Sequence, residues 1–145
     1  EKIYNQKEKK SETLFYKGKQ GLKTIFDEQI AIGKEILILG ASIKADEIIR
    51  FYFPHYDKKR VQKNISVKMI MDESVKENDQ LKKIQLSNIR FIPKEYATPT
   101  AINIYGDNVA IILWSENPIG ILIKEKDIAD SYRKYFDLLW GIAKK

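Results

Sequence analysis

The feature that most constrains the fold is a change in strand spacing near residue 100. Before it, predicted strands and helices alternate, as in parallel sheets with helical crossovers. After it, Ala101–Tyr105, Val109–Trp114 and Ile119–Lys124 follow one another with only turn residues between them, which is typical of antiparallel strands. The sequence therefore predicts an α/β domain of three layers, in which helices flank a mixed β-sheet.

Hydrophobic spacing predicts the individual elements. Ile36–Leu39 is a continuous apolar run that ends in Gly40-Ala41-Ser42, which favours a strand buried on both faces. Pro54 is expected to interrupt and restart a helix. The other predicted strands are Ser11–Lys17, Ile65–Met71 and Asn88–Ile92, and the predicted helices are 22–33, Lys44–Tyr52, His55–Asn64, Glu73–Gln85 and 128–143.

Composition excludes several classes of site. The 145 residues include no cysteine and one histidine, so disulfide scaffolds, cysteine-ligated metals and thiol catalysis are ruled out. The apolar runs are too short for a membrane span of about 20 residues. We therefore expect a cytoplasmic protein with no membrane partner, no metal and no cofactor. Residues 1–10 are interpreted as a linker remnant or arm, and residues 11–145 as one domain.

The charge balance is mildly basic. The formal net charge is +6, and most of the cations are lysines, whereas bidentate phosphate recognition favours arginine. The run Lys58, Lys59 and Arg60 is either an anion contact or a solvated helix face. The single histidine, His55, follows Pro54 among aromatic residues, which favours packing or partial exposure over catalysis.

Candidate ligand contacts lie after predicted strands, because ligands of α/β sheets collect beyond the carboxyl ends of strands. Ser42 either holds an anion or caps the following helix. Trp114 ends a strand, where it lines a pocket or packs in an interface. A small-molecule effector site would use Ser42, Arg90, Tyr105, Trp114 and Glu116.

The C-terminal part of the sequence resembles the closing half of a phospholipase D-like domain. The matching pieces are Asp107–Ile111, Gly120–Ile123 and Phe136-Asp137 with Trp140. In that family, this region carries a catalytic His, Lys and Asp. The resemblance places Pro99, Ala101 and Gly106 at those three positions, and none of these side chains supplies a nucleophile or a cation. It therefore implies a phospholipase D-like fold without catalytic residues, and we expect no enzyme.

From about residue 13, the whole chain is similar to the C-terminal domain of archaeal TrmB-like transcriptional regulators. That resemblance implies a homodimer that binds a small-molecule effector. It also implies that DNA is bound through a winged-helix domain upstream. Pairing would bring together the sheet edge near 101–114 of each copy. The pieces that carry the resemblance include Tyr16-Lys17-Gly18, Ile38-Leu39-Gly40, Ile89–Pro93, Ile104–Asp107, Trp114–Pro118 and Trp140–Ala143.

The leading prediction is a non-enzymatic dimerisation and effector-binding domain of such a regulator. The alternative prediction is a domain of the phospholipase D-like superfamily that binds nucleic acid directly or hydrolyses phosphodiesters. The basic charge and the run Lys58, Lys59 and Arg60 support this alternative.

Overall fold

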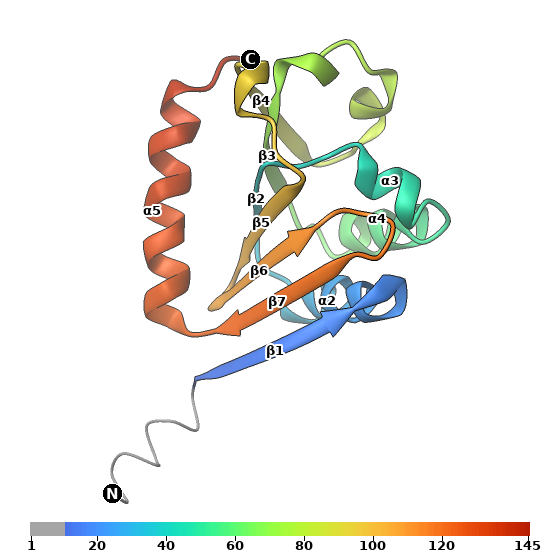
Figure 1. Cartoon of the computed structure of the whole chain (residues 1–145), viewed down its shortest axis with the longest axis vertical. Coiled ribbons are helices and arrows are strands. Elements are labelled where there is room, and N and C mark those ends of the chain that lie inside the picture. Colours follow the sequence, from blue (N-terminus) through green and yellow to red (C-terminus); the bar gives the residue numbers. More distant parts are fainter. Residues whose placement is uncertain (1–10) are drawn as a thin grey trace, which may run out of the picture.

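A seven-stranded sheet forms the middle layer of the domain (Figure 1). The computed structural model describes residues 11–145. The strands are β1 (Glu12–Lys17), β2 (Ile36–Leu39), β3 (Val67–Asp72), β4 (Ser87–Ile92), β5 (Thr100–Tyr105), β6 (Asn108–Leu113) and β7 (Ile119–Lys124). The helices are α2 (Gly18–Ile32), α3 (Lys44–Ile48), α4 (Phe53–Gln62) and α5 (Lys126–Ile142), with short 3₁₀ turns η1 (Glu73–Val75), η2 (Asp79–Lys83) and η3 (Lys94–Tyr96).

The sheet is mixed, as predicted. Its strand order is β1-β7-β6-β5-β2-β3-β4. β2, β3 and β4 run parallel to one another, and every other neighbouring pair is antiparallel. The parallel strands come from the part of the chain in which strands alternate with helical segments. β5, β6 and β7 come from the part in which short turns join them, and they pair antiparallel because a tight turn reverses the chain direction. β1 comes from the first part and pairs antiparallel with β7.

Helices cover both faces of the sheet, so the predicted three layers are confirmed. Figure 1 shows α5 on one side of the sheet and α2, α3 and α4 on the other. On the α5 side, Phe136 and Ala129 pack against Ile70, Ile104 and Val109 in one apolar cluster. On the opposite side, a larger core includes Leu22, Ile25, Phe26, Ile36, Tyr56, Met69, Tyr105, Trp114 and Leu122.

The predicted helix over Glu73–Gln85 is wrong. The structure has the two short turns η1 and η2 there, with an irregular stretch between them. The Asp72 side chain accepts a hydrogen bond from the backbone N–H of Ser74, and Asn78 accepts one from Gln80. Such local bonds start a new turn each time and compete with a continuous helix. By contrast, Pro54 lies in the first turn of α4, as the predicted restart requires.

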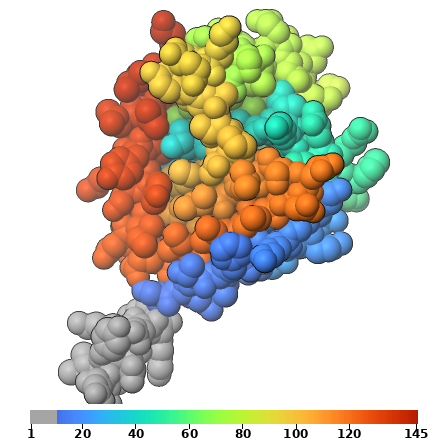
Figure 2. Space-filling view, in the orientation of Figure 1, coloured from blue at the N-terminus to red at the C-terminus, as the bar shows by residue number. Residues whose placement is uncertain are grey.

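The predicted pairing of two copies along 101–114 is wrong in its geometry. β5 lies between β2 and β6, and β6 lies between β5 and β7, so the backbone groups of both strands are already paired. The edges of the sheet are β1 and β4. Figure 2 shows β1 (blue) along one border of the molecule. The homodimer itself stays a prediction, and the predicted arm at residues 1–10 lies outside the described residues.

Within residues 11–145, the helices lack the combination of length and apolar character that crossing a membrane requires.

Candidate functional site

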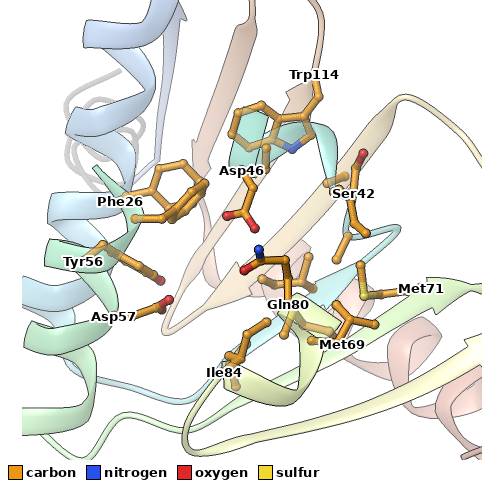
Figure 3. A pocket seen from close by; sticks show the side chains of 18 of the residues that line it. Phe26, Ser42, Asp46, Tyr56, Asp57, Met69, Met71, Gln80, Ile84 and Trp114 are labelled. Atoms are coloured by element: carbon orange, nitrogen blue, oxygen red, sulfur yellow. The ribbon is translucent and has the colours of Figure 1, made fainter. Parts of the chain in front are cut away.

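A cavity of about 830 Å³ opens on the face of the sheet opposite α5. The strands β2, β3 and β5 provide its floor, while α3, α4 and the turn η2 surround it. Figure 3 shows side chains from these elements converging on the cavity, with Trp114 and Phe26 on one side and Met69 and Met71 on another. The volume falls within the range of about 300–1,000 Å³ that is usual for small-molecule sites.

The floor belongs to a row of side chains that crosses four strands, of which β5, β2 and β3 line the cavity. Alternation along β5 turns Ala101 and Asn103 toward the cavity, which both of them line. In the strand register, Asn103 lies opposite Ala110 of β6 and opposite Ile38 of β2, and Ile38 lies opposite Met69 of β3. Asn103 is therefore the only polar side chain in this row.

The Asn103 side chain lacks a partner for its oxygen. The residue is 2% exposed, and its Oδ1 accepts no hydrogen bond from any of residues 11–145. A buried polar atom without a partner costs about 1–3 kcal/mol. Native structures keep few such atoms, and those they keep call for an explanation. Here the residue that carries the unpaired oxygen lines a cavity.

One wall of the cavity is aromatic. The rings of Phe26 and Trp114 are nearly parallel, with centroids 6.1 Å apart and an angle of 18° between the planes. Phe53 and Tyr56 both meet the Phe26 ring edge to face, at 5.2 and 5.4 Å. The Tyr56 hydroxyl donates a hydrogen bond of 2.5 Å to Gln29 Oε1, and burial raises the pKa of this phenol. Tyr56 therefore serves as a neutral wall residue.

Charged and polar groups gather at the rim, where solvent reaches them. Asp46 and Glu47 of α3 and Lys83 of η2 are exposed residues that line the cavity. Figure 3 shows the Asp46 and Gln80 side chains projecting into the opening. Partial desolvation by the surrounding side chains raises the pKa of the Asp46 carboxyl. The rim thus carries both signs of charge, whereas the floor is apolar apart from Asn103.

Arg60 is the buried cation beside the cavity, and its donors are engaged. It is 1% exposed. Its guanidinium donates to the carbonyl oxygens of Ile65 at 2.7 Å, Leu86 at 3.3 Å and Gln85, and to the Asp57 carboxylate at 3.4 Å. Burial raises the pKa of Asp57, although the charge of Arg60 opposes the shift. Arg60 therefore holds the structure together and presents no guanidinium to a solvent anion.

Two of the five residues predicted to contact an effector line the cavity. Trp114, 3% exposed, forms part of the aromatic wall. Ser42 lies after β2, and its Oγ accepts a hydrogen bond of 3.1 Å from the backbone N–H of Lys44. The N-cap residue of α3 is Ile43, which makes no side-chain hydrogen bond, so Ser42 contacts the first turn from one position before the cap.

The other three predicted residues lie elsewhere. Tyr105 is fully buried, and its hydroxyl faces Glu28 at 3.4 Å. Arg90 lies against α5, where it donates to the Trp140 carbonyl oxygen at 2.7 Å and stacks on the indole ring at 4.4 Å. Glu116 is exposed in the turn between β6 and β7.

Sequence reasoning missed Asn103, Met69 and Met71 as cavity residues. A signal for Asn103 was present, because it is the one amide in the apolar strand Ala101–Tyr105. The methionines gave no such signal, since an apolar residue in a strand is most often a core residue. Their position at the floor depends on how α3, α4 and η2 leave this part of the sheet uncovered.

The three positions matched to the catalytic residues of the phospholipase D-like family are split along β5. Ala101 lines the cavity, and Pro99 lines a smaller neighbouring cavity of about 480 Å³. Gly106 lies beyond the opposite end of β5, where its carbonyl oxygen accepts a hydrogen bond of 2.6 Å from Arg133. His55 is exposed on α4.

No protein-family model and no curated protein matches the sequence. Solved structures do match. NucT from Helicobacter pylori is 12% identical with a TM-score of 0.66, and the match covers 92% of this chain and 98% of NucT. Nuc from Salmonella typhimurium, a phospholipase D family member, is 11% identical with a TM-score of 0.67, covering 92% and 97%.

TrmBL2, an archaeal chromatin protein with a novel mode of DNA binding, also matches. It is 15% identical with a TM-score of 0.59, and the match covers 92% of this chain but 54% of TrmBL2. At these identities the likenesses establish the fold. The predicted phospholipase D-like fold is therefore confirmed.

The prediction that the chain is not an enzyme is contradicted by these neighbours. NucT and the phospholipase D family member Nuc match over nearly their whole lengths, so the domain has the complete fold of an enzyme family. The prediction rested on three substituted positions, which concern only one catalytic route. Substitution of Pro99, Ala101 and Gly106 does not exclude enzymatic activity as such.

Proposed function

We propose that this domain binds a small-molecule effector in the cavity on the sheet face opposite α5, as part of a TrmB-like regulator that acts on nucleic acid. The observation that carries the proposal is Asn103, a residue of the cavity floor whose buried side-chain oxygen has no hydrogen-bond partner among residues 11–145. A ligand that donates a hydrogen bond to this oxygen recovers the free energy that the empty site loses.

Three further observations support this proposal. The cavity combines an apolar floor and an aromatic wall with a few polar groups, which is the usual composition of small-molecule sites. The likeness to TrmBL2 supports a link to nucleic acid. In addition, residue 101, at one of the catalytic positions of the related fold, is an alanine on the cavity floor, which leaves room for a ligand.

Filling the cavity is expected to abolish ligand binding. Ala45 of α3 is partly exposed and lines the cavity, so Ala45→Phe places a ring in the opening. We expect affinity for any ligand found in a thermal-shift screen of sugars, nucleosides and aromatic metabolites to fall at least about tenfold. Calorimetry measures the affinity, and Ala31→Phe, at an exposed position of α2 away from the cavity, is the matched control.

Fluorescence locates the ligand independently. The chain has two tryptophans, and Trp140 lies on the α5 side of the sheet. In a Trp140→Phe variant, only Trp114 reports, so a ligand in the cavity changes its emission. Unchanged emission on binding, or equal affinity of the Ala45→Phe and Ala31→Phe variants, contradicts the proposed site. The absence of any ligand in the screen contradicts the proposed function.

Direct DNA binding is a second candidate, favoured by the likeness to TrmBL2. Lys58 and Lys59 are exposed on α4, so both are available to phosphates. If they bind DNA, the Lys58→Ala/Lys59→Ala variant should bind more weakly and lose about two from the slope of log affinity against log salt. Fluorescence anisotropy measures the slope. The exposed pair Lys82 and Lys83 gives the control, and equal effects of the two double variants would indicate net charge alone.

A further inference from the structure

We infer that the ligand, whose binding rests on the function proposed above, carries an uncharged aromatic ring that donates a hydrogen bond from a ring N–H or phenolic O–H to Asn103 Oδ1. The buried part of the cavity determines this chemistry through its one unpaired acceptor, its flat aromatic wall and its lack of an available charge. Each of these features excludes a different class of compound.

The unpaired acceptor requires a donor. The row that crosses the floor runs Ala110, Asn103, Ile38 and Met69, and only Asn103 carries polar atoms in its side chain. Its oxygen has no donor in residues 11–145. A purely hydrocarbon ligand would leave this oxygen unpaired in an even drier site, at a cost of about 1–3 kcal/mol. A ligand with one N–H or O–H at its buried end satisfies the oxygen.

The wall favours a flat ring. Phe26 and Trp114 lie nearly parallel, and Phe53 closes on Phe26 at 5.2 Å, so the ligand meets faces and edges of aromatic rings. Offset and edge-to-face contacts with such rings contribute about 0.5–1.5 kcal/mol beyond simple burial. Met69 and Met71 line the cavity as well. Their flexible side chains adapt to the shape of a ring. Rotation of the Asn103 amide exchanges its oxygen and nitrogen, so the oxygen can turn to a donor of the ligand.

The buried end of the ligand carries no charge. Arg60 lines the cavity, but its guanidinium already donates to Asp57 and to three carbonyl oxygens. A carboxylate or phosphate at the floor would therefore meet no free cation. An ammonium group there would meet no unpaired carboxylate, since Asp57 is paired with Arg60 and Asp46 lies exposed at the rim. Burying an unpaired charge costs far more than an amide hydrogen bond returns.

A series of isosteric rings tests the inference directly. Indole carries the N–H, benzofuran places an oxygen there, and benzothiophene places a sulfur. By calorimetry on the full chain, we expect indole to bind at least about tenfold more tightly than the other two, the ratio that one buried hydrogen bond to an otherwise unpaired acceptor supplies. Because the comparison is between ligands, it needs no variant to fold.

A variant then tests whether the preference for indole depends on Asn103. Asn103→Leu keeps the shape of the side chain but removes the acceptor, so indole and benzothiophene should bind equally. The unliganded variant should be at least as stable as the parent chain by thermal unfolding, because an unpaired buried oxygen has been removed. Asn88→Leu, at an exposed position of β4, is the control and should keep the preference for indole.

Several outcomes separate the inference from the proposed function. Equal binding of the three rings, with Ala45→Phe still blocking them, overturns the inference and leaves the effector site in place. Tighter binding of benzofuran shows that Asn103 presents its N–H group, which also overturns it. If none of the rings binds while sugars or nucleosides do, the ligand class is wrong. If none of the rings, sugars or nucleosides binds, both the inference and the proposed function are contradicted.

Discussion

Arg60→Met should lower the free energy of unfolding by about 3–5 kcal/mol, the usual cost of removing one partner from a buried ionic network. The arginine is 1% exposed and donates to carbonyl oxygens of Ile65, Gln85 and Leu86. Methionine fills much of the same volume but donates nothing, so these oxygens lose their partner in a place that water does not readily reach. Urea unfolding followed by circular dichroism measures the change.

The large cost follows from what Arg60 connects. Its carbonyl partners lie just before β3 and just before β4, so one side chain on α4 joins the segments that lead into two parallel strands. Lys59→Met, one residue earlier, is the matched control, because Lys59 is exposed. It should change stability by less than about 0.5 kcal/mol. Similar effects of the two variants would show that Arg60 contributes only surface charge.

Phe136→Ala should also destabilise the domain by about 3–5 kcal/mol, the usual cost of truncating a buried phenylalanine. Phe136 is 1% exposed and lies in the apolar cluster between α5 and the sheet. Its ring stacks on Trp140, with centroids 5.6 Å apart and an interplanar angle of 19°. Among the described residues, α5 is the one helix on this face, so no second element can move in to fill the space.

The adjacent tyrosine provides the control for this prediction. Tyr135 is 60% exposed and meets Tyr132 edge to face at the surface. Tyr135→Ala should therefore cost less than about 1 kcal/mol. Thermal and urea unfolding of both variants give the comparison. If Tyr135→Ala proves as costly as Phe136→Ala, the face of α5 that packs on the sheet has been misidentified.

The fold class followed from local patterns because its determinants are short-range. The Gly106-Asp107-Asn108 turn and the Asn117-Pro118 turn sit between apolar strands, and tight turns leave antiparallel pairing as the only arrangement. The helical period of 128–143 likewise predicts α5, with Phe136 on its buried face. The helix predicted over Glu73–Gln85 failed for a local reason as well, since Asp72 and Asn78 each cap a separate turn.

The candidate site was predicted only in part. Ser42 and Trp114 were found because strand ends are general sites for ligands, and both line the cavity. Tyr105 and Glu116 also lie at or just after a strand end, but Tyr105 is directed toward Glu28 and Glu116 lies in the turn between β6 and β7. Arg90, predicted from within a strand, is held against α5. A strand end indicates a region of the sheet, but it does not indicate the face toward which a side chain points.

The sequence by itself determined the positions of the strands, the mixed sheet and the three layers, because these depend on periodicity and turns within a few residues. Tertiary structure alone decided the roles of Arg60 and Asn103. Because Arg60 belongs to a basic run, the sequence suggests a surface cation. In the structure it donates hydrogen bonds to backbone carbonyl oxygens just before β4. Asn103 is buried without a partner for its side-chain oxygen because β5 lies inside the sheet, between β2 and β6, where water does not reach that oxygen. The burial of a side chain and its hydrogen-bond partners depend on segments that are distant in the sequence, so local sequence patterns do not predict them.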